Sequence, residues 1–298
     1  MSKHLSPGSL TPTAHETFER RLTVLRPELH RYASRMVGSA VDGEDVVQDA
    51  LLSALVAFDT VGPKGDDRPW LFRIVHNAAI DYLRKRQRRE RTVALVQREI
   101  ASDGSELNDK VASRAALSLF MLLTPTERAA VILSDVFSYS NNESAAILQT
   151  SLAALKAGLH RGRIKLRRLA DSPKPERSLD DREQARLRRF VDLFNAHEFD
   201  AIRAMLSHDV RFELVSQFSG DRLSFAAYFT RYADMTDRQL AIGTIDGQLA
   251  VLVVRTDIPA DTPNSLILID WAEEQIIRLR DYSHARYVLT GASIFRLA

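Results

Sequence analysis

Two short runs of basic residues are the chemically most distinctive feature of this 298-residue sequence. Arg84–Arg91 contains six basic residues and one acid, and Lys156–Arg168 contains six basic residues and no acid. Both runs fall in segments with helical periodicity, so each helix would carry several cations. Two separate cationic helices suit contacts with nucleic-acid phosphates, although a solvated charged surface has the same composition.

The overall composition narrows the class of protein. The net charge of +2 hides an asymmetry, because residues 1–171 hold 25 basic against 20 acidic residues and residues 172–298 hold 16 against 19. The absence of cysteine excludes disulfides and thiolate metal sites, and no histidines stand at metal-binding helical spacing beside carboxylates. We expect no metal and no cofactor. Without a signal peptide or an apolar run of membrane-spanning length, we expect a cytoplasmic protein that does not bind membranes.

The elements that would position the first basic run are three helices. The first helix should end at Gly38, the second should begin near Asp42, and Gly62 and Pro63 should separate it from a third. That third helix should begin near Pro69 and continue into the first basic run. The apolar stripe of the first helix comprises Phe18, Leu22, Leu25, Leu29, Tyr32, Ala33 and Met36.

The second basic run should lie on the last helix of a helix-turn-helix. Thr124–Glu127 and Ser140–Glu143 both match the capping box, which predicts two short helices. Ser151 is a suitable N-cap for the final helix, which runs from Leu152 to about Leu169. This order places the cations on the helix that enters the DNA groove in such modules.

Beyond residue 182 the pattern changes to a mixture of helices and strands. Helices are expected at 185–195, 199–206 and 225–232, and the turn Asp246–Gly247 predicts a hairpin. This order of elements predicts an α+β fold with an antiparallel sheet. The expected strands are 210–214, 240–245, 249–255, 266–271 and 275–280, with the third and fourth in the centre.

The second helix also carries an acidic edge that could bind a partner. Asp45, Gln48 and Asp49 lie about one turn apart, so they can share a surface while neighbouring apolar residues pack inward. The segment Gly43–Ala54 resembles the helix with which sigma-70 factors bind the clamp coiled coil of RNA polymerase. The resemblance implies that Asp45, Gln48 and Asp49 contact the polymerase core; an ordinary acidic surface helix is the alternative.

The third helix resembles a promoter-reading segment. Arg68–Arg86 includes Trp-Leu-Phe-Arg-Ile followed by Asn, Ala and Asp-Tyr-Leu-Arg, and resembles the minus-10 segment of extracytoplasmic-function (ECF) sigma factors. Binding of single-stranded DNA uses cations for phosphates and polar or aromatic groups for bases. We expect Trp70 and Tyr82 in the core. The resemblance implies that four residues contact the minus-10 DNA, namely Arg73, Asn77, Arg84 and Lys85.

The last basic helix, Leu152–Arg167, resembles the minus-35 recognition helix of the same family. The residues expected at bases or flanking phosphates are Ser151, Ala154, Lys156 and His160. Those expected to anchor phosphates are Arg161, Arg163 and Lys165. Gly158 departs from the family pattern. Each of the two glycines, Gly158 and Gly162, weakens the helix by about 1 kcal/mol relative to alanine.

The C-terminal part resembles a SnoaL-like domain, from Arg189 through the strand at Val210. The resemblance implies a cone of sheet and helices that contacts the sigma modules and tunes their activity. A small-molecule ligand and a homodimer through this domain are both left open. The side chains that could act as general acid or base in this domain are His208, Asp209, Glu213, Asp270 and His284. Their spacing in the sequence does not require that they share one site, so we expect no enzymatic activity.

Taken together, the sequence predicts a multidomain protein with two all-α helical modules and a C-terminal α+β SnoaL-like cone. We expect an ECF sigma factor that binds RNA polymerase core and promoter DNA and is modulated in cis. The alternatives are a helix-turn-helix regulator with a ligand-binding domain and a SnoaL-type enzyme fused to a DNA-binding module. The expected boundaries are 16–98 for the region 2-like domain, 99–118 for a connector, 119–171 for the region 4-like helix-turn-helix, 172–182 for a linker and 183–298 for the regulatory domain.

Overall fold

The computed structural model describes residues 14–63, 66–96, 120–170, 180–215, 237–257 and 263–297, with the single residues 117, 229 and 232. Most of the expected connector at 99–118 and of the expected linker at 172–182 lies outside these ranges. Below, residues 14–96 are called the first helical module, 120–170 the second helical module and 180–297 the C-terminal domain. No helix among the described residues is long and apolar enough to span a bilayer.

The first helical module contains α1 (Ala14–Val37), α2 (Ala40–Val61) and α3 (Asp67–Val96). Gly38 ends α1 in the left-handed conformation with φ of +81°, as expected for a C-terminal glycine. Ser39 then caps α2 by accepting a hydrogen bond from the amide of Asp42. The expected apolar stripe of α1 forms the core with α2 and α3, and its fully buried members include Phe18, Leu22, Leu29, Tyr32 and Met36.

The second helical module contains α5 (Pro125–Val131), the π-helix η1 (Ile132–Val136), α6 (Asn141–Ile147) and α7 (Leu152–Ala170). Both expected capping boxes are present, with Thr124–Glu127 at α5 and Ser140–Glu143 at α6. The module does not stand alone, because Ile132, Leu133 and Ile147 belong to the core of the first module. Aromatic rings strengthen this junction, with Phe72 in edge contact with Phe137 and Tyr139.

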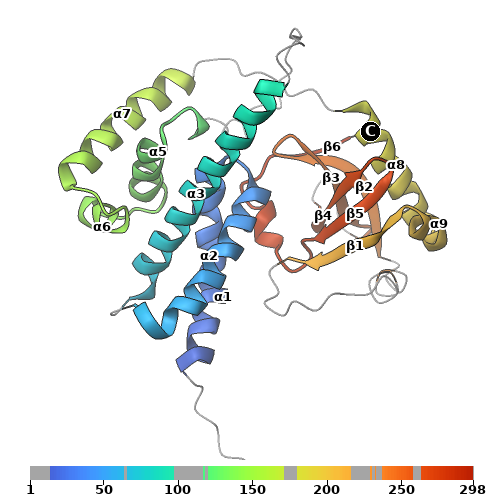
Figure 1. Cartoon of the computed structure of the whole chain (residues 1–298), viewed down its shortest axis with the longest axis horizontal. Coiled ribbons are helices and arrows are strands. Elements are labelled where there is room, and N and C mark those ends of the chain that lie inside the picture. The colour runs from blue at the N-terminus through green and yellow to red at the C-terminus, as the bar shows by residue number, and fades with distance from the viewer. Residues whose placement is uncertain are drawn as a thin grey trace, which may run out of the picture.

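The C-terminal domain places helices on a mixed sheet (Figure 1). Its elements are α8 (Asp181–Asn195), α9 (Phe199–Ala204), β1 (Leu206–Leu214), β2 (Arg238–Ile245), β3 (Gln248–Arg255), β4 (Ser265–Ala272), β5 (Gln275–Asp281), the 3-10 helix η2 (Arg286–Leu289) and β6 (Ile294–Arg296). The described strands follow the order β1-β5-β4-β3-β2-β6. β3 and β4 are central, as expected, and Asp246 and Gly247 form the hairpin turn with positive φ values.

One expectation about this sheet was wrong. It is not purely antiparallel, because β1 pairs with β5 in parallel, with Phe212 opposite Leu279. Alternation along a strand shows which side is buried and carries no information about the direction of its neighbour. The short η2 and β6 were also not predicted. The expected order of two helical modules followed by an α+β unit is confirmed.

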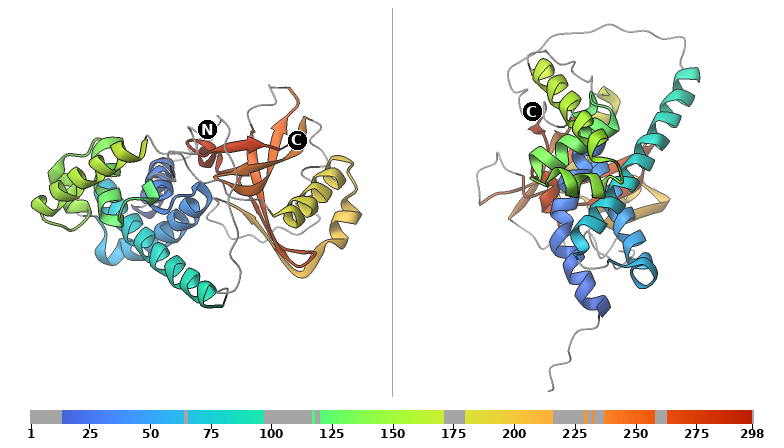
Figure 2. Two further views of the ribbon diagram at one scale, coloured as in Figure 1. Left: turned by 90° about the horizontal axis from the view of Figure 1, so that it is seen from above. Right: turned by 90° about the vertical axis from the view of Figure 1, so that its left-hand side faces the viewer.

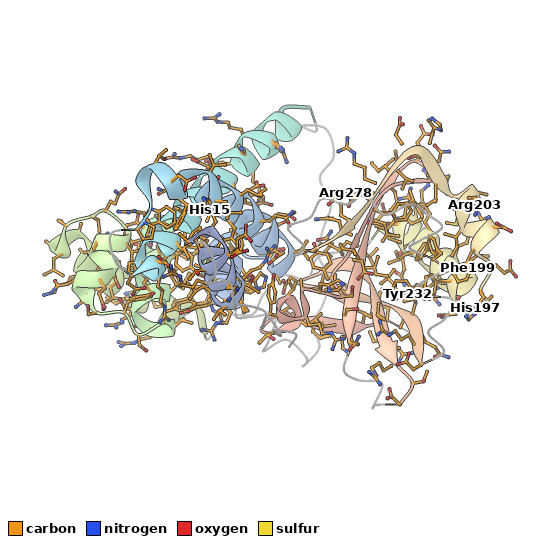
Figure 3. The ribbon with its side chains drawn as sticks, turned by 90° about the horizontal axis from the view of Figure 1, so that it is seen from below. His15, His197, Phe199, Arg203, Tyr232 and Arg278 are labelled. Atoms are coloured by element: carbon orange, nitrogen blue, oxygen red, sulfur yellow. The ribbon has the colours of Figure 1, made fainter. Side chains whose placement is uncertain are left out.

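The two faces of the sheet are covered by different parts of the chain. One face packs on α8, with Phe190, Val251 and Ile267 in a shared apolar cluster. On the other face, Ala40 and Val41 at the start of α2 join a cluster that contains Leu252 and η2 residues. Figure 2 shows the helical modules on one side of η2 and the sheet on the other. Figure 3 shows Arg278 on the side that faces the helical modules, and His197, Phe199 and Arg203 at the far side.

Candidate nucleic-acid interface

The acidic edge of α2 has the orientation that its periodicity predicts. Val46, Val47, Ala50 and Leu51 are buried, whereas Gln48 and Asp49 are exposed. Asp45 differs from its two neighbours, because Arg280 of β5 donates from Nη1 to Asp45 Oδ2 at 3.1 Å. The side chain of Asp45 keeps 43% of its surface exposed. Partial burial raises its pKa, against the opposing effect of the Arg280 charge.

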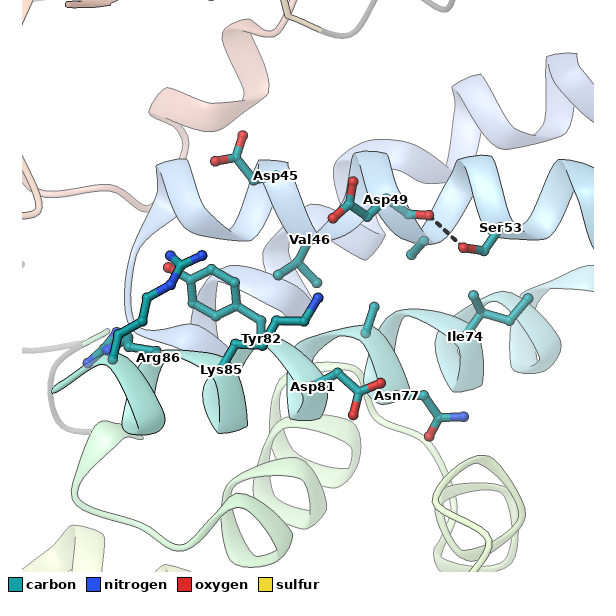
Figure 4. A pocket seen from close by; sticks show the side chains of 13 residues that line it. Asp45, Val46, Asp49, Ser53, Ile74, Asn77, Asp81, Tyr82, Lys85 and Arg86 are labelled. Carbon is teal, nitrogen blue, oxygen red and sulfur yellow. Dashed lines mark hydrogen bonds between the residues drawn. The ribbon is translucent and has the colours of Figure 1, made fainter. Parts of the chain in front are cut away.

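Three of the four α3 residues expected at minus-10 DNA lie on one side of the helix, and the fourth is turned away from them. At about 100° per residue, Arg73, Asn77 and Arg84 fall within about 40° of one another, and Lys85 is turned by about 100° from Arg84. Asn77 and Lys85 line a groove of about 550 Å³ between α2 and α3, in which Lys85 reaches from α3 toward α2 (Figure 4). Arg73 and Arg84 lie outside this groove, next to α6 and α5 respectively.

The aromatic residues of α3 have structural positions. Trp70 is 8% exposed and belongs to the core, as predicted. Tyr82 is half-buried, packs against the same core and lines the α2–α3 groove beside Asp49 and Asp81. The α2 wall of this groove carries carboxylates, and the α3 wall carries Asp81 beside the three cations Lys85, Arg86 and Arg89, so the charge of the groove is mixed.

Of the seven residues expected at minus-35 DNA, the five basic or histidine residues fall into two groups on α7. Lys156, His160 and Arg163 are exposed and lie within about 60° of one another around the helix. Ser151 caps α7, because its Oγ accepts from the amide of Ala154 at 3.1 Å. Ala154 is exposed in the first turn of α7. Arg161 and Lys165 belong to the second group, which turns toward α5.

Glu127 on α5 holds the second group of α7 cations. Lys165 Nζ lies 2.8 Å from Glu127 Oε2, and Arg161 Nε lies 3.2 Å from Glu127 Oε1. Although burial opposes ionisation, hydrogen bonds from Lys165, Thr124 and Arg161 lower the pKa of Glu127 to about 2. The capping glutamate of α5 therefore also fixes the position of α7. Arg163 is paired as well, with Asp135 of η1 through Nη2 at 2.5 Å.

The two glycines of α7 lie on the side that packs against α5. A Cβ atom on Gly162 would lie 2.7 Å from Val131 Cγ2 and 3.2 Å from Glu127 O, so this glycine permits close approach of the two helices. A Cβ on Gly158 would meet only Ala130 and Thr126 at 3.9 Å, which is ordinary contact. Only Gly162 therefore has a steric reason to be glycine.

Sequence reasoning missed a buried ionic cluster between α1, α2 and η2. Arg26 Nε donates to Glu44 Oε1 at 2.9 Å and to the hydroxyl of Tyr287 at 2.7 Å. Tyr287 Oη in turn donates to Glu44 Oε1 at 2.9 Å. Burial raises the pKa of Glu44, and the Arg26 charge opposes this shift. Arg26 and Glu44 lie on two different helices, and no local pattern in the sequence relates either of them to Tyr287.

Of the five groups considered for catalysis, Glu213 and Asp270 are paired with arginines of β5. Arg278 lies 2.6 Å from Glu213 and 4.0 Å from Asp270, and Asp270 also accepts from Arg280 at 3.5 Å. The remaining three, His208, Asp209 and His284, are exposed. Within the described ranges, no group of three or more such acidic or histidine side chains is arranged to hold a metal ion.

Comparisons with known proteins match the two helical modules. A family model described as Sigma-70 region 2 matches residues 23–89, and one described as Sigma-70, region 4 matches residues 113–166. The RNA polymerase sigma factor CarQ of Myxococcus xanthus is 32% identical over 160 residues, which cover 52% of this chain and 90% of CarQ.

Two mycobacterial proteins are also similar. The ECF RNA polymerase sigma factor SigG of Mycobacterium tuberculosis is 28% identical over 217 residues, which cover 63% of this chain and 59% of SigG. This chain therefore spans less than two thirds of the length of SigG. The crystal structure of the Mycobacterium tuberculosis ECF sigma factor SigJ has 20% identity and a TM-score of 0.36, with coverage of 92% of this chain and 98% of SigJ.

Proposed function

The chain belongs to the ECF group of the sigma-70 family, and we propose that it directs promoter-specific transcription initiation by RNA polymerase. In this proposal α2 binds the polymerase core through Asp45, Gln48 and Asp49. The minus-10 element is bound by α3, through Arg73, Asn77, Arg84 and Lys85. The minus-35 element is bound by the exposed side of α7, with Lys156 and His160 nearest the bases and Arg163 on a phosphate.

One observation carries this proposal, namely that cations of both basic helices are exposed on two different modules beside an acidic helix. Arg84 and Lys85 are exposed on α3, and Lys156 is exposed on α7. Cations on DNA-binding surfaces displace condensed counterions, which makes binding strong and dependent on salt. Carboxylates near DNA would oppose this, so the acidic edge of α2 suits a protein partner better. For Arg161 and Lys165 we propose a positioning role through Glu127, with weaker contact to phosphates.

A run-off transcription assay with core polymerase tests the proposal. We expect transcripts from a cognate promoter when this chain is added to core polymerase, and none with core polymerase alone. The variant Lys156→Ala, His160→Ala should lose most of this activity and show a flatter dependence on salt. The control is Arg182→Ala, which removes an exposed arginine of α8 whose ion-pair partner, among the described residues, is Glu274 of the C-terminal domain. Binding to duplex DNA without any initiation would contradict the proposal and favour a helix-turn-helix regulator.

We infer in addition that the C-terminal domain, which we expect to be SnoaL-like, restrains initiation by occupying part of the polymerase-binding edge. Arg280 binds Asp45, one of the three residues assigned to polymerase contact, at 3.1 Å. Since Arg280 is only 7% exposed and Asp45 lies against the sheet, a polymerase contact at Asp45 competes with this pair. Arg280→Gln should therefore increase the affinity for core polymerase.

A matched variant on the same strand controls this test. Arg278→Gln also removes a β5 arginine, but its ion pairs, with Glu213 at 2.6 Å and Asp270 at 4.0 Å, lie inside the C-terminal domain, and it acts on Asp45 only as a nearby charge. Its polymerase affinity should rise less than that of Arg280→Gln. Equal affinities for Arg278→Gln and Arg280→Gln would contradict restraint at Asp45.

A further inference from the structure

The corner between α1 and α2, here residues Met36–Ala40, is the place where all parts of the molecule meet. α1 ends at Val37 and α2 begins at Ala40, so only Gly38 and Ser39 separate the two helices. The end of a helix leaves backbone carbonyls without partners, and the start of a helix leaves free amides. Within five residues, the corner thus offers acceptors and a donor to whatever packs on it.

The second helical module holds the carbonyl side of the corner. Arg128 of α5 is 3% exposed, and its guanidinium donates to Met36 O. The same guanidinium donates to Leu123 O at 3.0 Å, which connects the corner to the start of its own module. The side chain of Met121 covers Gly38 so closely that a Cβ there would lie 2.4 Å from Met121 Cγ. Arg86 of α3 adds a bond to Val37 O at 3.2 Å.

The C-terminal domain holds the amide side of the same corner. The amide of Ala40 donates to Asp246 Oδ2 at 2.7 Å, across 206 positions. The other oxygen of Asp246 accepts from the amide of Ser293 at 3.0 Å, so the carboxylate is used on both sides. His30 Nε2 lies 2.8 Å from Ala40 O, within hydrogen-bond distance, and the His30 ring packs edge-on against Tyr287 at 5.3 Å.

The charges at the corner follow the dipoles of both helices. Two arginines meet the C-terminal end of α1, where partial negative charge collects, and Asp246 meets the positive N-terminal end of α2. The position of Arg128 is nevertheless costly, because burial and repulsion from Arg86 lower its pKa to about 10. A buried cation that loses one acceptor pays a large desolvation penalty, so Arg128 depends on Met36 O staying in place.

We propose that this corner couples the docking of the C-terminal domain to the docking of the second helical module. Asp246 fixes the position of Ala40 through its amide. The two linking residues, Gly38 and Ser39, carry that position to the end of α1, where Met36 O accepts from Arg128. Release of the C-terminal domain then weakens the hold on the module that carries α7. The biological role of this coupling rests on the proposed function, since a sigma factor must place α3 and α7 on separate promoter elements. The measurement of the coupling does not depend on that function.

The test measures two distances in the free full-length chain. The sequence has no cysteine, so introduced pairs can carry spin labels or fluorophores without background. Val56 on α2, Leu152 on α7 and Ile277 on β5 are natural sites, because they are apolar and exposed by 82%, 38% and 39%. The pair Val56–Leu152 reports on the second module, and the pair Val56–Ile277 reports on the C-terminal domain.

The variant is Asp246→Asn. Asparagine tolerates the positive φ of this position, 50°, but retains only one of the two acceptor oxygens that Ala40 and Ser293 use. Asp257→Asn is the control, since Asp257 is an exposed aspartate of the same domain whose partner is Arg255. For Asp246→Asn we expect both distance distributions to show an undocked population at least about fivefold larger than in the unaltered chain. A factor of about five is the lower end of the usual range of allosteric coupling. Asp257→Asn should change neither distance.

Coupling must also operate in reverse, because linkage is reciprocal. Met121→Ala removes the side chain over Gly38 and keeps the backbone carbonyl that accepts from Arg128, and it should lengthen Val56–Ile277 as well as Val56–Leu152. The proposal is overturned if Asp246→Asn releases the C-terminal domain while Val56–Leu152 keeps its distance, or if neither distance responds. Both distances can be measured in a chain that does not initiate transcription. Failure of the proposed function would therefore leave the test of coupling intact, and the two proposals can fail separately.

Discussion

Glu44 on α2 and Tyr287 in η2, 243 positions apart, share a hydrogen bond in which Tyr287 Oη donates to Glu44 Oε1 at 2.9 Å. Glu44 is fully buried and also accepts from Arg26. A buried carboxylate with a cationic and a neutral donor is stable only while both partners remain. The junction between the C-terminal domain and the first helical module is therefore an ionic contact that opening would expose to water.

Tyr287→Phe should weaken this junction by about 1.5 to 3 kcal/mol, the usual contribution of a hydrogen bond to a charged group. The ring would remain against His30, so the loss is confined to the hydroxyl. Faster hydrogen exchange of the amides at the start of α2 would measure it.

Tyr282→Phe is the matched control for Tyr287→Phe. Tyr282 is also a tyrosine of this junction and is 1% exposed, but its hydroxyl has no hydrogen-bond partner among the described residues. Removing a buried unpaired hydroxyl is neutral or stabilising. Exchange rates that rose equally in both variants would show that ring packing, not the bond to Glu44, holds the junction.

The two glycines of α7 should respond to alanine with opposite signs. Gly158→Ala should raise the thermal midpoint of the chain, since alanine favours helix by about 1 kcal/mol and its Cβ finds only ordinary contacts at 3.9 Å. Gly162→Ala should lower the midpoint despite the same propensity gain, because its Cβ would lie 2.7 Å from Val131 Cγ2. Thermal melts of the two variants decide the matter; a shift in the same direction for both would refute the packing argument.

Local sequence rules predicted most elements but none of the contacts between modules. Capping boxes at Thr124 and Ser140, the N-cap Ser151 and the turn at Asp246 depend on neighbours within four residues, and all four were found. The pairing of Asp45 with Arg280 depends on how two separately folded units meet, which no local spacing encodes. For the same reason the parallel pairing of β1 was missed.

The candidate site shows the same division between local and long-range information. Periodicity identified the exposed and buried sides of α2 correctly, because the 3.6-residue repeat is a property of one helix. It could not show that Arg161 and Lys165 turn to Glu127, since α5 and α7 meet only after folding. The roles of these residues in polymerase and DNA binding remain predictions that the experiments above address.

His30 and His76 should titrate far below other histidines in water. Burial lowers the pKa of His30 to about 4, against a bond to Ala40 O and with repulsion from Arg26 and Arg35. Burial also lowers the pKa of His76, next to the Tyr32 hydroxyl at 2.8 Å, to about 4. Both pKa values are lower in the folded chain than in the unfolded chain. The free energy of unfolding linked to these two histidines is therefore complete above pH 6.5 and is lost as pH falls toward 4. The loss is about 1.4 kcal/mol per pH unit for each histidine.

Proton NMR of the imidazole rings measures these pKa values directly. The spectrum of the chain in concentrated urea is the reference, where both rings should titrate near 6.5. Values near 6.5 in the folded chain would show that neither ring is buried as described.

The last prediction compares two glutamates with the same local role. Glu127 and Glu143 both occupy the third position of a capping box, and glutamine can replace glutamate in that motif. Glu143 is exposed, and its hydrogen-bond partner among the described residues is Ser140, so Glu143→Gln should leave stability nearly unchanged. Glu127→Gln also removes the charge that holds Arg161 and Lys165, and should cost about 1.5 to 3 kcal/mol.

This difference also separates two roles for the α7 cations. If Arg161 and Lys165 serve mainly to position α7, Glu127→Gln should lower promoter affinity, because the exposed residues Lys156 and His160 lose their fixed orientation. If the two cations act mainly on phosphates, freeing them from Glu127 should raise affinity and steepen its salt dependence. Binding measured at several salt concentrations distinguishes the two, and we expect the first result, since the Glu127 carboxylate is buried and both ion pairs are short.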